Sequence, residues 1–510
     1  MSRRSAFPLR QPADPHDVRV LAASAPMRAS LLGGLLAVVV AVAAGCGGDG
    51  GASGLGAPPA GELVDGSALG DGRVVGVGHE RRDGQSQALL VVVDGDGNLE
   101  WRAGLPAIGE ERSGHFDAVA VPSDGEPPTI YAAGRAMRTS DRRESGVVVA
   151  FRDDGETLWE SVPWPDGPSE IEALRIVGDD LFVTGFAEVA VADGPSARGM
   201  LVARVARDSG AVEWVDVLES QADPLGFTAG VSIDVSERGY VGAAGFASPG
   251  NGRAGWLVGM WNAAGERLWE SLRTAPGSAD LGWEGGDLNV AHEGRFDAQD
   301  GFLVIGDVFS GREGSDMSLV RYAPDTGVIG FEVVRGAALA SGGASFDEGT
   351  ALVTRGERAW VGYSVANEDS GPALWEAFAA LYDTTTGERL WEVPFGGVSA
   401  SGETVLDLAL DEAGDLHAAG STSDAGGVGK HFTVARWDGE GEPLWITEVD
   451  VPGSDSLDDD EATHLVIEPS GDVWAFGRLD AGDGVEVPAI CRVAADGRLL
   501  WSYPAGARAR

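Results

Sequence analysis

The sequence predicts an all-β protein built from eight copies of one unit, each unit made of four antiparallel strands. The first observation is a glycine followed four residues later by an aromatic residue, at Gly97/Trp101, Gly155/Trp159, Gly210/Trp214, Gly265/Trp269, Gly327/Phe331, Gly387/Trp391, Gly441/Trp445 and Gly497/Trp501. The second is a glycine that ends a short apolar run, at Gly78, Gly134, Gly185, Gly245, Gly306, Gly362, Gly420 and Gly477. The aromatic residues recur about every 57 residues. Eight units in residues 61–510 predict an eight-bladed β-propeller, and a ring of seven blades with a spare unit is the alternative.

The seventh unit displays the four strands most clearly. Residues 404–411 (TVLDLALD), 415–421 (DLHAAGS), 431–437 (HFTVARW) and 444–449 (LWITEV) are separated by turns rich in Gly and Asp. Alternating apolar residues between such turns are typical of β-hairpins. A β-sandwich would not repeat at this length, and an open β-solenoid usually has much shorter repeats.

Both parts of the Gly-x-x-x-Trp mark have a physical reason. The glycine lies in the turn between the third and fourth strands, where a positive φ is needed. An Asp or Asn precedes it in every unit and can hydrogen-bond nearby backbone. We expect the aromatic residue to open the fourth strand and to pack between neighbouring blades.

The N-terminus predicts export. Residues 31–44 (LLGGLLAVVVAVAA) are apolar, Arg28 precedes them, and Ala43-Ala44-Gly45-Cys46 follows. This arrangement predicts a secretory signal over residues 1–45, with Met27 as an alternative start. The segment that ends at Cys46 resembles a bacterial lipobox. The resemblance implies that Cys46 carries a lipid, whereas the alternative is a signal that merely ends beside a cysteine. Residues 46–60 predict a flexible tether and residues 61–510 the propeller.

Two stretches of the repeat carry a family resemblance. Residues 380–391 (ALYDTTTGERLW) resemble the repeat of bacterial PQQ-like propellers. The longer unit, with DEAGDLHAAGS and EPSGDVWAFGR in its middle, looks more like the SBBP-type β-propeller repeat of secreted bacterial proteins. The resemblance covers most of residues 61–505 and implies a fold, which by itself does not fix a function.

Charge narrows the range of partners. The 510 residues carry a formal net charge of −43, and Lys430 is the single lysine. Such a charge argues against nucleic acid and against anionic membrane surfaces as partners of the whole body. We expect a monomer whose contact with the membrane is the lipid on Cys46. Gly47 after that cysteine favours, by resemblance to sorting rules, the outer membrane of a Gram-negative cell.

The sequence gives little support for a catalytic or metal-binding role of any residue. The seven His residues show no i, i+4 pair, so the spacing of zinc proteases is absent. His417 and His431 lie in expected strands, and Cys491 occupies a core position of the repeat. Residues 94–98 (DGDGN) and 454–461 (SDSLDDDE) have oxygen ligands for Ca²⁺, but a polar turn and a solvated loop explain them. The sequence therefore predicts no catalytic residue, no metal site and no cofactor.

One face of the ring is the expected binding face. Connections between second and third strands vary between units, and variable loops on a rigid scaffold often bind partners. In the first two units these connections hold six arginines: Arg81, Arg82, Arg135, Arg138, Arg142 and Arg143. They either solvate long loops or form a basic patch for a protein or small molecule that bears carboxylate or phosphate.

We therefore expect a lipid-anchored cell-envelope propeller that binds a partner without catalysis. The alternative is a quinoprotein dehydrogenase that uses pyrroloquinoline quinone (PQQ). The resemblance implies Ca²⁺, a catalytic carboxylate and often a vicinal cysteine pair for such an enzyme, and this chain has no vicinal pair. A purely structural surface repeat protein is the third alternative.

Overall fold

The computed structural model describes residues 60–510 apart from 83, 106–111, 123–127, 139–141, 191–195, 220–227, 248–254, 275–288, 310–313, 337–344, 368–373, 397–402, 424–428, 451–459, 481–484, 504–507 and 510. The expected signal, the expected lipidation site at Cys46 and nearly all of the expected tether lie outside these residues. Within them, no helix has the length and apolar character that crossing a membrane requires.

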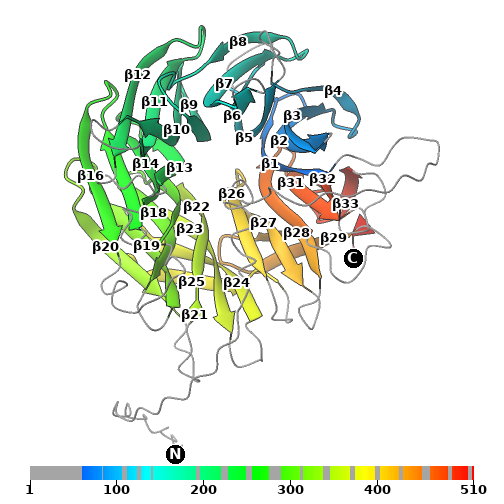
Figure 1. The fold of residues 1–510 in the computed structure, drawn as a ribbon. Coiled ribbons are helices and arrows are strands. Elements are labelled where there is room, and N and C mark those ends of the chain that lie inside the picture. The colour runs from blue at the N-terminus through cyan, green and yellow to red at the C-terminus, as the bar shows by residue number, and fades with distance from the viewer. Residues whose placement is uncertain are drawn as a thin grey trace, which may run out of the picture. The chain divides into compact units, whose positions relative to one another are not determined.

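The described residues form eight antiparallel sheets arranged as the blades of a ring, which confirms the predicted propeller (Figure 1). Blade one contains β1 (Gly61–Ala68), β2 (Val74–Arg82), β3 (Gln85–Val93) and β4 (Leu99–Ala103). Blade two contains β5 (Arg112–Ala120), β6 (Thr129–Arg138), β7 (Glu144–Arg152) and β8 (Thr157–Ser161). Blade three contains β9 (Ser169–Val177), β10 (Asp180–Val189), β11 (Ala197–Ala206) and β12 (Val212–Glu219). Blade four contains β13 (Thr228–Val235), β14 (Val241–Ala247), β15 (Gly255–Trp261) and β16 (Arg267–Thr274).

The second half of the ring repeats this order. Blade five contains β17 (Ala291–Phe296), β18 (Phe302–Phe309), β19 (Gly314–Tyr322) and β20 (Ile329–Arg335), with β21 (Ser345–Phe346) paired to β19. Blade six contains β22 (Glu348–Arg355), β23 (Arg358–Asn367), β24 (Leu374–Asp383) and β25 (Arg389–Pro394). Blade seven contains β26 (Thr404–Leu410), β27 (Leu416–Ser423), β28 (Lys430–Trp437) and β29 (Pro443–Asp450), with β34 (Arg508–Ala509) paired to β29. Blade eight contains β30 (Glu461–Ile467), β31 (Val473–Asp480), β32 (Glu486–Val493) and β33 (Leu499–Tyr503).

The aromatic residue of the first mark joins each blade to the next, as the sequence predicts. Six tryptophans donate an indole hydrogen bond to a carbonyl in the following third-to-fourth-strand turn: Trp101 to Asp153, Trp159 to Arg207, Trp214 to Ala263, Trp269 to Pro324, Trp391 to Gly439 and Trp445 to Ala495. The marked glycine of that turn has a positive φ and lies against the indole ring. A Cβ at Gly210 would come within 2.6 Å of the Trp159 ring. The turn therefore needs glycine both for its backbone angle and for space.

The second recurring glycine allows a close approach inside the blade. Each innermost strand skips one residue in its register with the second strand, which is a β-bulge. A Cβ at Gly185 would lie 2.0 Å from the Glu170 carbonyl oxygen, and one at Gly420 1.9 Å from that of Thr404. Glycine is thus required opposite the bulge.

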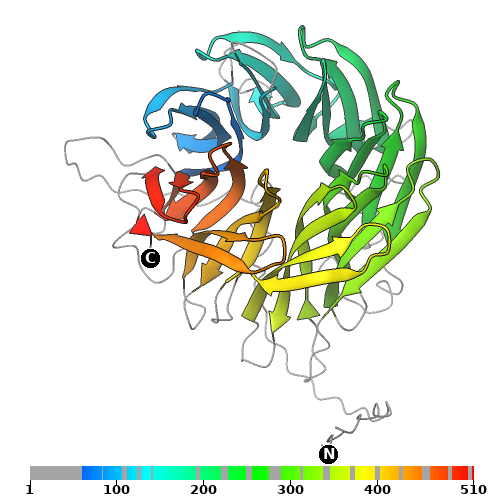
Figure 2. The ribbon, with the colours of Figure 1, turned by 180° about the vertical axis from the view of Figure 1, so that it is seen from behind.

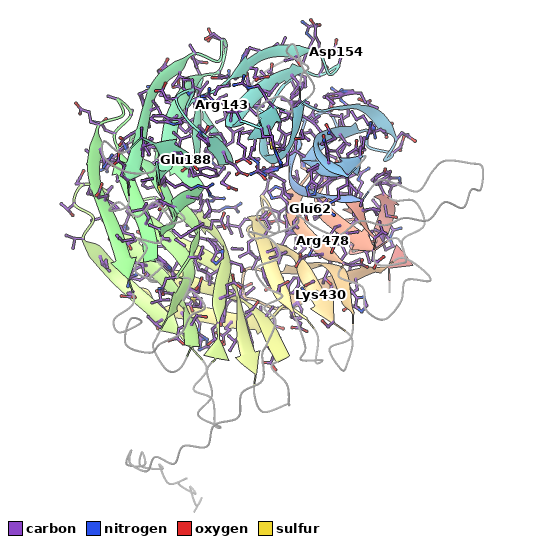
Figure 3. All side chains as sticks on the ribbon, in the orientation of Figure 1. Glu62, Arg143, Asp154, Glu188, Lys430 and Arg478 are labelled. Atoms are coloured by element: carbon purple, nitrogen blue, oxygen red, sulfur yellow. The ribbon has the colours of Figure 1, made fainter. Side chains whose placement is uncertain are left out.

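Side chains close the ring, because the first and last blades each contain four strands of their own. Thr463 Oγ1 donates to the Leu63 carbonyl at 2.8 Å, and Arg478 lies 3.5 Å from Glu62 (Figure 3). Trp501 packs against the turn glycine of blade one. Figure 2 shows the first blade in blue beside the last in orange and red.

The second-to-third-strand connection of the first unit, which the sequence predicts to be one of the variable loops, is a tight hairpin. β2 and β3 stay in register from His79/Ala88 to Arg82/Gln85, so the connection is short. The polar residues of this stretch extend the two strands past the apolar core. In the seventh unit the four expected strands match β26 to β29 with ends within two residues.

Candidate ligand-binding site

Polar side chains on the innermost strands connect neighbouring blades. Each accepts a hydrogen bond from a backbone N–H of the next innermost strand: Asp65 from Val119 (2.7 Å), Ser232 from Gly294 (3.0 Å), Asp234 from Phe296 (2.9 Å) and Asp407 from Leu465 (3.0 Å). These strands are sheet edges, whose N–H groups need partners. Acidic residues at the inner edge therefore have a structural role.

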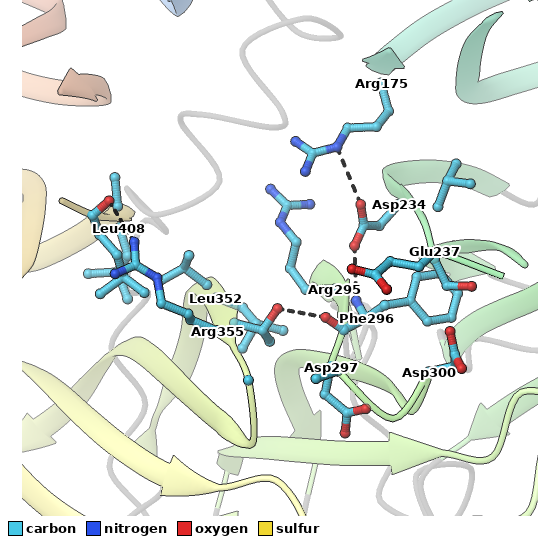
Figure 4. A pocket seen from close by; sticks show the side chains of 18 of the residues that line it. Arg175, Asp234, Glu237, Arg295, Phe296, Asp297, Asp300, Leu352, Arg355 and Leu408 are labelled. Carbon is cyan, nitrogen blue, oxygen red and sulfur yellow. Dashed lines mark hydrogen bonds and ion pairs between the residues drawn. The ribbon is translucent and has the colours of Figure 1, made fainter. Parts of the chain in front are cut away.

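A cavity of about 630 Å³ opens among the innermost strands of blades four to eight and their first turns, with Arg175 of blade three at its rim (Figure 4). This volume lies within the range of about 300–1,000 Å³ that small-molecule sites occupy. The cavity lies at the end of the strands where first and second strands are connected. The second-to-third-strand connections, which the sequence predicts to form the binding face, lie at the opposite end of the strands.

One register position of the ring contributes three charged side chains to this cavity. It pairs with the residue three before the recurring glycine, and its occupants in blades one to eight are Ser67, Ala120, Arg175, Asp234, Arg295, Thr354, Ala409 and Val466. Three consecutive blades thus present Arg, Asp and Arg where the other blades present small, hydroxyl or apolar side chains.

The arginine and aspartate side chains of this row meet in the cavity. Arg175 Nε lies 3.3 Å from Asp234 Oδ1, while Asp234 Oδ2 accepts the Phe296 N–H. Arg295 forms an ion pair with Glu293 and donates to the Gly294 carbonyl at 3.2 Å. Figure 4 shows both guanidinium groups directed into the cavity. Both oxygens of the Asp234 carboxylate therefore have partners. Each of the two guanidinium groups has more N–H donors than these contacts use.

Three other carboxylates of the cavity wall also have partners. Asp297 pairs with Arg321 at 2.6 Å, and Asp300 pairs with Arg238 at 2.9 Å. Asp407 lies 2.8 Å from His464. Glu237 also lines the wall, and among the described residues it is the lining carboxylate that has no ion pair.

His464 bridges two carboxylates with its two different nitrogens. Nδ1 lies 2.8 Å from Asp407 Oδ2, and Nε2 lies 3.2 Å from Asp65 Oδ1. Burial lowers the pKa of this imidazole, but Asp407 and Asp65 outweigh burial and raise it to about 9. An imidazolium between two carboxylates is the state that this geometry favours.

Two other histidines each direct one nitrogen at two carboxylates. His115 Nε2 lies 2.7 Å from Glu170 Oε1 and 3.1 Å from Asp117 Oδ2. His292 Nε2 lies 3.2 Å from Asp307 Oδ1 and 3.0 Å from Glu348 Oε1. In each group the ligand atoms lie within 4.8 Å of one another, the spacing of a possible metal site. Burial raises the pKa of Asp307 to about 6, against the opposing effect of His292.

The six arginines predicted for binding lie in the second-to-third-strand connections of blades one and two and the strand ends beside them. Arg81, Arg82 and Arg142 are exposed. Contacts within the fold join Arg82 to Glu80 (2.5 Å), Arg135 to Glu144 and Glu170 (both 3.5 Å), Arg138 to Arg143 and Arg142 through backbone groups, and Arg143 to the Pro165 carbonyl. Several of the predicted arginines thus hold strands and loops in place.

Other sequence candidates take the structural roles expected of them. Asp94 accepts hydrogen bonds from the backbone N–H of Asp96 and Asn98, so its carboxylate stabilises a hairpin turn. Cys491 is fully buried, and burial raises the pKa of its thiol. His417 and His431 are buried in blade seven. Residues 454–459 lie outside the described residues.

Sequence reasoning missed the Arg-Asp-Arg row, although a signal for it existed. The strands that carry it read IEALRIV, VSIDV and AHEGRF. The row becomes visible when the eight units are aligned on the glycine that ends the short apolar run. Three consecutive units then have a charged residue at a position where the other units have none.

The structure resembles solved β-propellers of several kinds. It is similar to quinohemoprotein alcohol dehydrogenase from Comamonas testosteroni, at 14% identity over 77% of this chain and 67% of that one, with a TM-score of 0.47. It is also similar to Chaetomium thermophilum Sqt1, at 11% identity over 82% of this chain and 93% of that one, with a TM-score of 0.45. A third similar structure is the periplasmic gluconolactonase PpgL of Pseudomonas aeruginosa, at 14% identity over 73% of this chain and 94% of that one, with a TM-score of 0.41. No protein-family model and no curated protein sequence matches the chain. At these identities the likeness concerns the fold alone.

Proposed function

We propose that this protein is an exported, lipid-anchored binding protein that holds a small carboxylate-bearing ligand in the cavity at the inner edge of its ring. The observation that carries the proposal is the row of Arg175, Asp234 and Arg295. The aspartates of the wall each have a partner, whereas Arg175 and Arg295 keep guanidinium N–H donors that can meet a ligand. Such donors bind carboxylates in a two-pronged geometry.

A binding role without catalysis is supported by the way the polar groups of the cavity wall are used. Both nitrogens of His464 already face carboxylates, so this histidine is a poor general base. Ser236 Oγ accepts the backbone N–H of Tyr240, and Thr354 Oγ1 donates to the Phe296 carbonyl. These hydroxyls hold turns and strands together and are not activated by a histidine.

Cys46 anchors the propeller in the envelope in this proposal, and residues 46–60 give it reach. Such an anchor keeps the cavity in the envelope, where small organic acids and peptide termini are available. The strongly acidic body repels anions at long range, so the local arginines select ligands that fit closely.

Calorimetric titration of the whole chain with citrate and succinate tests the proposal. We expect saturable binding that weakens with salt, and at least tenfold weaker binding in the Arg175→Gln and Arg295→Gln variants. Arg498→Gln is the matched control, because Arg498 is 70% exposed and pairs with Asp496 at an outer turn. Equal affinity in all four proteins, or no binding of either acid, would overturn the proposed site.

An absorption spectrum recorded after addition of PQQ, Ca²⁺ and an alcohol separates this proposal from the quinoprotein alternative. PQQ itself bears three carboxylates, so a binding protein for small acids can hold it but leaves it in its oxidised form. A stable bound quinone that oxidises an alcohol would favour the enzyme.

A further inference from the structure

His292, Asp307 and Glu348 come from three strands of two adjacent blades. His292 is the bulge residue of β17, Asp307 follows the recurring glycine of β18, and Glu348 begins β22. We propose that these three side chains bind one divalent transition-metal ion, such as Zn²⁺ or Mn²⁺, that joins blades five and six. The site is separate from the cavity, and it stands or falls independently of the proposed function.

The convergence on a single nitrogen distinguishes this group from an ordinary ion pair. One imidazole nitrogen carries at most one proton, so Nε2 of His292 cannot donate well to Asp307 and Glu348 together. His464 shows the alternative arrangement in the same protein, with one carboxylate on each nitrogen. Two oxygens and one nitrogen around a common point are what a metal ion requires.

The distances also suit an ion. Ligand atoms about 2.0–2.2 Å from a metal lie about 2.8–3.1 Å apart at an octahedral angle and about 3.3–3.6 Å apart at a tetrahedral angle. The two distances from His292 Nε2, 3.2 Å and 3.0 Å, lie between these limits. All three ligand atoms lie within 4.8 Å of one another, so modest shifts of the side chains would let them take up an ion.

Charge favours a cation at this group over the group of His115. Glu170 in that second group already lies 3.5 Å from Arg135, which supplies positive charge. Among the described residues, the ion pairs of Asp307 and Glu348 are with His292 alone. Two carboxylates and a neutral imidazole carry two negative charges, which balance the charge of one divalent ion. This mixed set of nitrogen and oxygen ligands suits Zn²⁺ or Mn²⁺ better than Ca²⁺.

Backbone contacts hold Asp307 in place. The Asp307 backbone N–H donates to the Val290 carbonyl at 3.1 Å, and the Asp307 carbonyl accepts the Trp256 indole N–H at 2.7 Å. The three ligand side chains keep 11–22% of their surface exposed, so an ion has access and solvent can complete its coordination.

Metal retention by the whole chain tests the proposal. The protein is stripped with a chelator, loaded with excess Zn²⁺, passed through metal-free buffer and analysed by elemental mass spectrometry. We expect about one ion per chain, and at least tenfold weaker retention in His292→Gln and Glu348→Gln with an unchanged circular dichroism spectrum. His79→Gln, which removes a histidine 3.9 Å from Glu62, is the control and should retain the ion.

A second measurement does not depend on variants that fold. Crystals of the wild-type chain soaked in Mn²⁺ should show an anomalous peak within bonding distance of all three side chains. No retained ion in the wild type, undiminished retention in both variants, or an anomalous peak at another place only would overturn the proposal.

Discussion

The turn glycines between third and fourth strands give the sharpest test of how the blades are joined. Gly441 has a φ of +86°, and an added Cβ would lie 3.0 Å from Cδ2 of Trp391 in the preceding blade. Gly439 lies two residues earlier in the same turn, has no positive φ, and an added Cβ there would meet no atom within 4 Å. Replacing each glycine by alanine therefore separates two effects. Gly441→Ala tests the need for a positive φ and for space beside the indole, whereas Gly439→Ala measures the general effect of losing a glycine.

The cost of Gly441→Ala follows from two terms. A left-handed backbone costs a residue with a Cβ about 1–2 kcal/mol. Displacement of the indole weakens its 3.2 Å hydrogen bond to the Gly439 carbonyl, and such a bond contributes about 0.5–1.5 kcal/mol. We expect Gly441→Ala to lose about 2–3 kcal/mol of unfolding free energy. Gly439→Ala should be neutral or gain up to about 1 kcal/mol through the unfolded chain.

Urea unfolding of the whole chain, followed by tryptophan fluorescence and circular dichroism, measures both variants against the wild type. The midpoint of the first transition is the quantity to compare, because a large ring can unfold in more than one step. Equal losses in the two variants would refute the reasoning, since only Gly441 has the positive φ and the neighbouring indole.

Four further predictions concern other parts of the molecule. Phe331→Trp should raise stability by about 1 kcal/mol in urea unfolding, because an indole there can donate to the Thr384 carbonyl of the next turn; a loss would contradict this. His464→Gln should destabilise most near pH 6; the wild-type advantage should fade as pH rises from about 6.5 through about 9, where the raised pKa of His464 is crossed. A stability difference that does not change with pH would count against the two-carboxylate bridge. Cys46→Ser should release the protein from membranes and abolish palmitate labelling, and label on the variant would exclude lipidation at Cys46. Replacing Arg81, Arg82, Arg142 and Arg143 of blades one and two by serine should weaken capture of an acidic partner at low salt. Unchanged capture by the folded variant would remove these four residues from the binding surface.

The fold could be predicted because the features that build it are repeated. A turn that needs glycine and an aromatic residue that bridges blades occur in every unit, so eight imperfect copies reinforce one another. Phe331 fits this pattern, since it packs against Gly387 as the tryptophans pack against their own turn glycines. Strand ends were less predictable, because polar residues such as Arg82 extend a hairpin beyond the core without any change of pattern.

The candidate sites could not be predicted in the same way, because they depend on what differs between units. Asp65 and His464 are 399 positions apart in the sequence and meet only when the last blade closes on the first. His292, Asp307 and Glu348 have no local spacing that marks a metal site. Such residues are hard to recognise in a repeat sequence, because each one differs from the consensus of the eight units as many other residues do.

Acidic residues at the inner edge have two separable roles, and the distinction decides where a ligand can bind. Asp65, Asp234 and Asp407 accept N–H groups from the next blade, so protonating or replacing them would loosen the junction between blades. Their negative charge is a consequence of capping sheet edges, and it does not by itself indicate a cation site. Arg175 and Arg295 have no such structural requirement at positions where other blades manage with alanine or valine. The charged residues that the ring does not need for closure are therefore the ones to test first for binding.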